Sequence, residues 1–529
     1  MRRYFPSSVW SRYLLVPLAL TVTAGLALSA AVGSPGDPTG GAATTVSSGE
    51  RPLPLPGDPT LLAARAALRG GDGSPTLSLT RLALAYDRLS AAEQAQARVL
   101  LARPTDGAAD PYLDGYAPGA PQRTRCTRHF CFHWVTTTKD APPLRDADHD
   151  GRPDWVERII RRAESVWSFE VGTLGYRRPP GDGRRGGDSR FDLYLADLGA
   201  QGVYGYCPAE KPVPGEDYLF SSYCVLDDDF AEYPLAPLPS FRVTLAHEFF
   251  HAIQYGYDAA EDPWLMEASA TWMEEQFADA VNDNRQYLPF GQLGEPGVPL
   301  DQFPAGLAPY GNWAFVQRLS QEYGGQAVRA VWRRADARTG GRDEFATQAV
   351  DGFLRAHGSS LREFYAAFAA GNLAPGTVYE EGSAGDYPAA PVDHRVRLGP
   401  RHRTGQRVVA LDHLTSTTLA LRPTRAVTGA WRLRLDLRLP GPGHGADAVV
   451  VVELSDGSRV RRPVTLDRRG DATVRTGFDP GRVARVLVTL TNASLRFSCW
   501  QDSSFSCQGV SRDDKIKTYR VDATLRPPA

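Results

Sequence analysis

The chain has 529 residues, which exceeds the usual size of one domain and predicts about two to four. Its formal net charge is −2, with acidic and basic residues mixed throughout. This balance excludes the basic stripe of a nucleic-acid-binding protein, so no nucleic-acid partner is expected. Four of the 59 basic residues are lysines, a bias typical of a GC-rich bacterial genome.

Residues 1–31 have the pattern of a secretory signal peptide. Arg2 and Arg3 precede an apolar run from Leu14 to Leu28, and small residues follow as far as Ala31. The run is too short, and wrongly flanked, for a spanning helix. We therefore expect a secreted, extracellular protein without a membrane span after signal removal, and an uncleaved anchor is the alternative.

Residues 32–119 are predicted to form a linker and then a helical region. The stretch 32–60 is rich in Gly, Pro, Ser and Thr, as linkers are. Two amphipathic segments follow, at 59–68 and 78–101. Two interpretations stay open: a propeptide that covers a functional cleft, or a structural brace. The stretch 103–111, rich in Gly and Pro, is the expected exposed cleavage site of a propeptide.

The acidic stretch 146–157 matches the twelve-residue calcium-binding loop. It has carboxylates at positions 1, 3, 5, 9 and 12, glycine at position 6, and a backbone carbonyl available at position 7. The expected ligands are Asp146, Asp148, Asp150, Arg152 through its carbonyl, Asp154 and Glu157. Pro153 at position 8 and the missing incoming helix predict a solitary structural loop that binds Ca²⁺ at roughly 10⁻⁴ to 10⁻³ M. The alternative is an acidic, solvated turn.

Between this loop and residue 240 the pattern alternates between strand and helix. Phe191–Asp197 is expected to be an edge strand that can pair with an extended peptide. The triplet Asp227–Asp229 is interpreted as a solvated turn, with a second cation site as the alternative. The expected strands are 130–135, 190–198 and 222–226, and the expected helix is 153–171.

The stretch 244–256 places the pattern H-E-x-x-H on a predicted helix. His247 and His251 lie one turn apart on one face, so both imidazoles can reach the same ion. Glu248 stands where it can take a proton from a water on that ion. Glu267, 16 residues after His251 on the next predicted helix, supplies a third ligand. Zinc is the metal that such a set usually selects.

This five-residue pattern also occurs by chance, as exposed histidines beside a solvated glutamate. Here apolar residues fall around it at helical spacing, at Phe241, Leu245, Phe249 and Ile253. A buried helix does not normally carry His and Glu among such neighbours unless something satisfies them. The context therefore favours a metal site.

At these residues the chain resembles the zincin metalloproteases, in the branch whose third ligand is a glutamate on the next helix. The sequence W-L-M-E-A-S-A-T-W at 264–272 resembles the W-L-N-E-G-x-A-[ST]-[YW] signature of zinc aminopeptidases of that branch. Thermolysin has an aspartate where this chain has Thr271. The metzincin extension is absent, since Gln254 and Tyr257 replace its glycine and third histidine. The motif match covers about 30 residues. From about residue 120 onward the layout resembles secreted bacterial metalloproteases with an Asp-rich loop.

The resemblance implies a zinc-dependent peptidase that acts on a protein or peptide substrate. His247, His251 and Glu267 are then the zinc ligands, and Glu248 is the general base.

Three further residues are candidates for supporting roles. Glu274, two turns beyond Glu267, is a partner of a ligand or an alternative ligand. Tyr257 and Tyr310 are candidate donors to the oxyanion, although both are equally compatible with core aromatics.

An endopeptidase is the preferred activity, and two other functions stay open. A non-catalytic surface or cell-wall binding protein on a calcium-stabilised zincin scaffold is the first. The intact ligand set and base argue against it, because a vestigial site should have lost at least one of them. An aminopeptidase ranks lower, because no motif of the G-x-M-E-N type for a free N-terminus lies upstream.

The expected fold class is α+β. Residues 120–385 are predicted to form a zincin-like domain with a mixed sheet, the metal helix and a helical lower lobe at 303–368. Residues 395–529 are predicted to form an all-β sandwich, either a binding module or a stabilising appendage. Its clearest strands are 408–411, 417–421, 432–439, 448–454 and 486–490.

Six cysteines agree with export and allow 15 connectivities. They fall into three locally spaced pairs at predicted loops or hairpins, so we expect the disulfides Cys126–Cys131, Cys207–Cys224 and Cys499–Cys507. No C-x-x-C occurs, which argues against a cysteine metal site.

Overall fold

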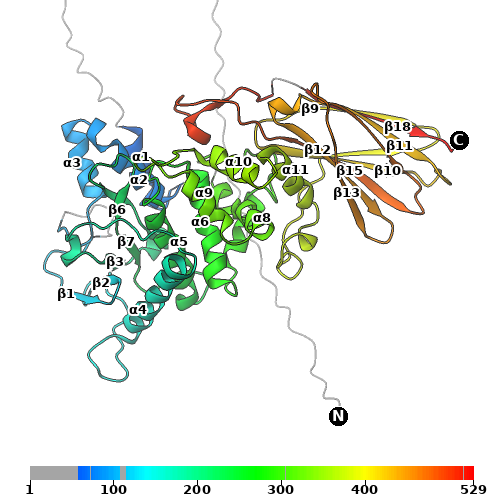
Figure 1. Ribbon diagram of the computed structural model, residues 1–529. Coiled ribbons are helices and arrows are strands. Elements are labelled where there is room, and N and C mark those ends of the chain that lie inside the picture. Colours follow the sequence, from blue (N-terminus) through cyan, green and yellow to red (C-terminus); the bar gives the residue numbers. More distant parts are fainter. Residues whose placement is uncertain (1–57, 72, 108–114, 304–305, 516–517, 529) are drawn as a thin grey trace, which may run out of the picture. The chain divides into compact units, whose positions relative to one another are not determined.

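The computed structural model describes residues 58–71, 73–107, 115–303, 306–515 and 518–528, all within one compact unit. The predicted signal peptide and most of the linker lie outside the described residues. A helical segment comes first, then a mixed α/β half, then a C-terminal β half (Figure 1). Helices and sheets are both present, as the α+β prediction requires. Across the described part of the chain, no helix is long and apolar enough to cross a membrane.

Three helices make up the N-terminal helical segment, our name for described residues 58–107. They are α1 Pro59–Ala67, α2 Pro75–Ala85 and α3 Ala91–Leu100. The predicted segment 78–101 is therefore divided between two helices. Ser90 starts α3 with a capping box, since its side chain accepts from Glu93 N and the Glu93 carboxylate accepts from Ser90 N.

A five-stranded mixed sheet forms the first layer of the α/β half. Its order is β1-β2-β3-β7-β4, in which β2, β3 and β7 are parallel and the outer strands are antiparallel. The strands are β1 Gln122–Cys126, β2 Phe130–Val135, β3 Phe191–Ala196, β7 Cys224–Asp227 and β4 Gly205–Tyr206.

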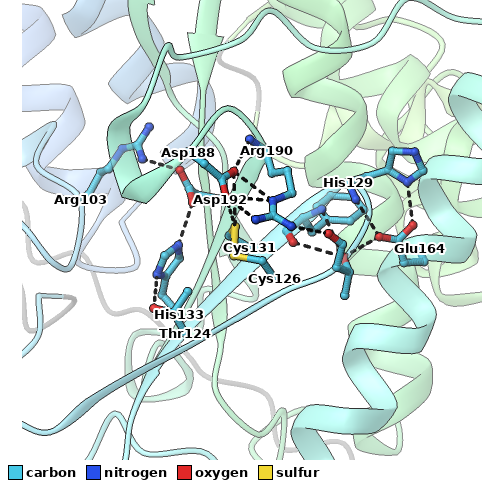
Figure 2. Close-up of a disulfide and its surroundings, with 12 residues drawn as sticks. Arg103, Thr124, Cys126, His129, Cys131, His133, Glu164, Asp188, Arg190 and Asp192 are labelled. Carbon is cyan, nitrogen blue, oxygen red and sulfur yellow. Dashed lines mark hydrogen bonds and ion pairs between the residues drawn. A yellow bond between two sulfur atoms is a disulfide. The ribbon is translucent and has the colours of Figure 1, made fainter.

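The prediction that Phe191–Asp197 is an edge strand was wrong. Strand β3 is central, and all its residues are buried. Its alternation is misleading because Asp192 does not face water. The Asp192 carboxylate lies 2.6 Å from Nη1 of Arg103 and 2.7 Å from Nε2 of His133 (Figure 2). A buried charge is tolerated when it is paired in this way.

Helices α4 and α5 pack beside this sheet, and α6 packs on α5. Helix α4 spans Asp154–Trp167 and continues into a π-helical turn at Ser168–Thr173, close to the predicted 153–171. Helix α5 spans Pro237–Gln254 and helix α6 spans Pro263–Ala278, and they pack against each other. Both begin with proline, whose fixed φ and missing N–H suit the first helical turn.

The region 303–368 is mostly helical within its described residues, as predicted. Its helices are α7 Ala308–Gly311, α8 Trp313–Tyr323, α9 Ala327–Arg334, α10 Ala346–Ala356 and α11 Leu361–Gly371. Buried side chains from these helices join those of α5 and α6 in one hydrophobic core.

The C-terminal half contains two sheets, with strand orders β13-β12-β15-β10-β8 and β14-β11-β18-β9. Buried side chains from both sheets, such as Leu421, Leu435, Val450 and Val521, share one core. Two sheets around one core make a β-sandwich. The strands are β8 His394–Leu398, β9 Thr404–Ala410, β10 Thr415–Pro423, β11 Arg432–Arg438, β12 Ala446–Leu454, β13 Arg459–Pro463, β14 Asp471–Gly477, β15 Val483–Asn492 and β18 Thr518–Arg526.

All three expected disulfides are present, at Cys126–Cys131, Cys207–Cys224 and Cys499–Cys507. The first closes the β1–β2 hairpin (Figure 2). The last closes a loop of the β half that contacts the α/β half. In that loop the backbone N–H of Cys507 donates to Oδ1 of Asp262 over 2.8 Å, at the start of α6.

Candidate metal centre and cleft

Helices α5 and α6 bring the three predicted ligands together. Nε2 of His247 lies 3.1 Å from Oε2 of Glu267, and Nε2 of His251 lies 3.6 Å from the same oxygen. Both His251 and Glu267 are 0% exposed. The four-residue spacing on α5 produces this convergence, because it places both rings on the face that α6 covers.

The other nitrogen of each imidazole is held by a second side chain. Nδ1 of His247 lies 2.7 Å from Oε1 of Glu274, and Nδ1 of His251 lies 2.7 Å from Oε1 of Gln254. The Gln254 amide in turn donates to Met266 O over 2.9 Å. These acceptors at Nδ1 orient each ring so that its Nε2 points to Glu267, the arrangement in which Nε2 would bind a metal. Sequence reasoning missed Gln254, whose role depends on the neighbouring helix.

Two buried atoms of this cluster have no hydrogen-bond partner in the described structure, Nε2 of His251 and Oε1 of Glu267. Buried polar atoms are usually paired, so a buried nitrogen lone pair and a carboxylate oxygen left unpaired side by side require an explanation. A divalent cation supplies one. Two imidazole nitrogens and one carboxylate match the donors that zinc takes in catalytic sites, so these residues fit the metal.

The electrostatics of the cluster also favour a positive charge between the helices. Burial lowers the pKa of His247, but hydrogen bonds to Glu267 and Glu274 outweigh it and raise that pKa well above its usual value. Burial raises the pKa of Glu267, but the neighbouring His251 and His247 lower it overall. Burial raises the pKa of Glu274 to about 7, although its bond to His247 acts against the shift.

Glu248, the predicted base, lies on α5 between the two histidines and is also buried. Its Oε2 accepts a 2.7 Å hydrogen bond from Oγ1 of Thr76, on helix α2. Burial raises the pKa of Glu248, while the nearby His247 and His251 lower it. Nothing in the sequence around Thr76 pointed to this contact, which spans 172 residues.

The two candidate tyrosines lie in different environments. The ring of Tyr310 is stacked on His247, with centroids 5.8 Å apart and planes 20° apart. Tyr257 instead accepts from the backbone N of Arg177 over 3.2 Å, and the Arg177 guanidinium lies 4.4 Å from its ring centre. Tyr310 therefore belongs to the site, whereas Tyr257 is a buried core residue that contacts Arg177. The sequence did not single out Tyr287, whose ring centroid lies 5.3 Å from that of Tyr310.

Strand β4, an edge of the sheet, passes close to α5. A Cβ added to Gly205 would lie 3.2 Å from Cγ2 of Thr244, which precedes His247 by one turn. Glycine therefore permits the close approach of strand and helix. The chain then continues through Cys207 to β5 Ala209–Pro212, which pairs with β6 Phe220–Ser222.

The acidic loop before α4 gathers all five of its predicted carboxylates. Ligand oxygens of Asp146, Asp148 and Asp154 lie within 4.8 Å of one another, and so do those of Asp148, Asp150 and Glu157. Gly151 has a φ of +84°, the conformation that position 6 requires. Helix α4 begins at Asp154, which places Glu157 in its first turn as expected.

The Arg152 side chain lies beside two of these carboxylates. Its Nη1 is 3.5 Å from Asp150 and 3.7 Å from Glu157. Backbone amides add to the shell, since Gly151 N donates to Oδ2 of Asp146 over 2.9 Å. The loop thus already contains a cation, although an exposed guanidinium cannot satisfy five carboxylates.

The interpretation of Asp227–Asp229 as a solvated turn was wrong for its first two residues. Asp227 is 1% exposed and Asp228 is buried. The Asp227 carboxylate accepts from the amides of Leu198 and Gly199, at 2.9 and 2.7 Å, and so fixes a neighbouring turn. Burial raises the pKa of Asp227 to about 6 and that of Asp228 to about 8.

No family model matches the chain, and no curated protein matches it. Among solved structures, a mutant of PliG-Ec, a periplasmic lysozyme inhibitor of g-type lysozyme from Escherichia coli, is 13% identical. That match covers 25% of this chain and 96% of the other, with a TM-score of 0.15. The pre-peptidase C-terminal domain of a collagenase from Bacillus anthracis is 9% identical over 26% of this chain and 97% of its own, also with a TM-score of 0.15. Likenesses at this TM-score decide neither the fold nor the function.

Proposed function

We propose that this protein is a secreted zinc-dependent metallopeptidase of the zincin type, acting as an endopeptidase on proteins or peptides. The observation that carries the proposal is the pair of unpartnered buried atoms, Nε2 of His251 and Oε1 of Glu267, beside the buried carboxylate of Glu248. Buried polar atoms are usually paired, and these two belong to a group, His247, His251 and Glu267, whose ligand atoms lie within 4.8 Å of one another.

His247, His251 and Glu267 are the residues that would hold zinc. When bound, zinc supplies a Lewis acid that polarises a carbonyl and brings the pKa of a bound water to about 7. Glu274 and Gln254 hold the two imidazoles by their Nδ1 atoms and so orient Nε2.

Glu248 is the base in this proposal. It accepts the proton of the attacking water and passes it to the amine that leaves the cleaved peptide. Tyr310, stacked on His247, is the donor that we assign to the developing oxyanion. Calcium in the 146–157 loop stabilises the start of α4 and takes no part in the chemistry.

Secretion is also part of the proposal. The three disulfides are compatible with an oxidising, extracellular compartment, where such bonds persist.

Elemental analysis of purified protein tests the metal. We expect about one zinc per chain in the wild type and little in His251→Ala, because the variant lacks one of only three protein ligands. His402→Ala is the matched control, since His402 is exposed in the β half. Equal zinc in wild type and His251→Ala would refute the ligand assignment.

Hydrolysis of casein or gelatin, with and without a chelator, tests the activity. The N-terminal helical segment contacts Glu248 through Thr76. The assay is therefore run both on intact protein and on protein from which this segment has been released. Chelator-sensitive hydrolysis in either form supports the peptidase. Bound zinc without hydrolysis in both forms would instead favour a non-catalytic binding protein.

A further inference from the structure

Helix α2 contacts Glu248, the general base of the proposed site. Thr76, in its first turn, is 1% exposed, and its hydroxyl donates to Oε2 of Glu248 over 2.7 Å. The same hydroxyl accepts from the backbone N of Cys207 over 3.0 Å. Thr76 therefore bridges the catalytic carboxylate and the chain that follows edge strand β4.

The next turn of α2 makes a parallel contact. Oγ1 of Thr80 accepts from the backbone N of Ala209 over 3.0 Å and lies 2.8 Å from the hydroxyl of Tyr255. Two threonines one helical turn apart thus occupy two backbone donors two residues apart. Amides two residues apart on one side of an extended chain are the donors that a bound peptide strand uses.

The start of α2 also contacts Tyr310, the aromatic residue that is stacked on His247. The Ser74 side chain caps α2 by accepting from Leu77 N over 3.2 Å, and it also forms a hydrogen bond with Tyr310. Leu77 is buried in the same hydrophobic core as the residues of α5 and α6. The beginning of α2 is therefore packed into this core and is not an external strut.

Arg103, which follows α3, anchors the other end of the segment. It is buried, and it lies 2.6 Å from Asp182, 2.6 Å from Asp192 and 2.8 Å from Glu210. Figure 2 shows its guanidinium pointing at Asp192 on the central strand. The start of the stretch 103–111, expected to be exposed, is thus buried, because this ion cluster holds it. Exposed chain begins only at Asp106.

We propose that the N-terminal helical segment is an intramolecular inhibitor that occupies the substrate edge, and that the amides of Cys207 and Ala209 bind the backbone of a peptide substrate. The proposal rests on the proposed peptidase function. Thr76 weakens Glu248 as a base, because its hydrogen bond occupies one acceptor site of Oε2 and stabilises the ionised carboxylate. A brace would explain the anchor at Arg103, but it would not require contacts with Glu248 and both amides.

A double substitution, Thr76→Ala with Thr80→Ala, tests the contacts in the full chain loaded with zinc. We expect 1,10-phenanthroline to remove zinc at least fivefold faster, and peptide hydrolysis to rise by a similar factor. Ser78→Ala is the matched control, because Ser78 lies between the two threonines in sequence and on the opposite side of α2. Its zinc-loss rate should equal that of the wild type.

A second experiment releases the segment. A recognition sequence for a site-specific protease is inserted between the exposed Asp106 and Gly107. After cleavage the segment is held only by its contacts, so dilution should release it, whereas a tethered segment is insensitive to dilution. We expect zinc removal and peptide hydrolysis to rise at least tenfold on dilution of the cut protein, with no change in the uncut protein.

The outcomes separate this inference from the proposed function. Bound zinc with unchanged zinc-loss rates in both the double variant and the cut, diluted protein would overturn the inhibitor and leave the peptidase standing. Faster zinc loss without hydrolysis would support the covering segment and overturn the peptidase. Absence of zinc from the wild type would overturn both.

Discussion

Oε1 of Glu274 lies 2.7 Å from Nδ1 of His247, while Nε2 of the same imidazole faces Glu267 at 3.1 Å. A carboxylate behind a ligating histidine fixes the orientation of the ring and makes its other nitrogen a better ligand. Glu267 and Glu274 lie two turns apart on α6, so one helix supplies both a ligand and the support of another ligand.

The first prediction follows from this pair. Glu274→Gln removes the charge behind His247 while preserving the shape of the side chain, so zinc affinity should fall by about 10- to 100-fold. Competition with a chelating dye measures it. Glu275→Gln is the matched control, because Glu275 accepts from Asn284 over 2.8 Å and does not contact His247. Equal affinities in the two variants would show that Glu274 does not support the ligand.

The second prediction separates base from ligand. Glu248→Gln should retain zinc, because Glu248 is not among the three ligands, and should lose about 10²- to 10⁴-fold in peptide hydrolysis. The rate is measured on protein freed of the N-terminal helical segment, with zinc content measured in parallel. Activity within a fewfold of the wild type would remove Glu248 from the role of base.

The third prediction concerns the acidic loop. A ligand that binds only the native state adds about 1.4 kcal/mol of stability at 10 times its Kd, so calcium at about 1 to 10 mM should raise the melting temperature. Glu157→Ala should abolish that rise. Asp217→Ala, an exposed carboxylate outside the loop, should respond as the wild type does. A normal calcium response in Glu157→Ala would refute the loop as the site.

Arg152 allows a sharper test of the same loop. Its side chain lies near Asp150 and Glu157, while its expected role as a ligand uses only its backbone carbonyl. Arg152→Gln removes the competing guanidinium and keeps the carbonyl, so calcium should bind more tightly. Isothermal titration measures the change, and weaker binding would show that the guanidinium does not compete with calcium.

Short-range patterns carried most of what the sequence predicted correctly. The convergence of His247 and His251 follows from helical spacing, and Glu267 follows on the next helix. The disulfides join cysteines separated by 5, 17 and 8 residues, so local proximity identified them. The carboxylates of the acidic loop also come together within twelve consecutive residues.

Contacts between segments far apart in the sequence account for the features that local patterns did not predict. The alternation in β3 predicted an edge strand because an aspartate such as Asp192 normally faces water. Its buried partner, Arg103, is 89 residues away, so no local pattern indicated the pairing. The contact between Thr76 and Glu248 depends on the docking of α2, which no local pattern encodes. Asp227 was assigned to solvent for the same reason, since its amide partners come from the turn at Leu198.

The last prediction concerns pH and the junction of the two halves. His413 is 0% exposed, with Nδ1 2.8 Å from Asp514 and Nε2 2.9 Å from Asp301. Burial lowers its pKa, but the two carboxylates outweigh that effect and raise it to about 10. The folded pKa is thus above the unfolded value of about 6.5. The stabilisation by protonated His413 is complete below about pH 6.5 and is lost as the pH rises through about 10.

The wild type should therefore lose stability between pH 6.5 and 10, with an upper bound of about 1.4 kcal/mol for each unit by which the two pKa values differ. Other buried acids also titrate in this range, so the informative quantity is the difference from His413→Gln, whose stability should depend less on pH. Chemical denaturation at pH 6.5, 8 and 10 measures it. His402→Gln, at an exposed histidine of the same half, should keep the wild-type slope. If His413→Gln keeps that slope too, the charge on His413 does not stabilise the junction.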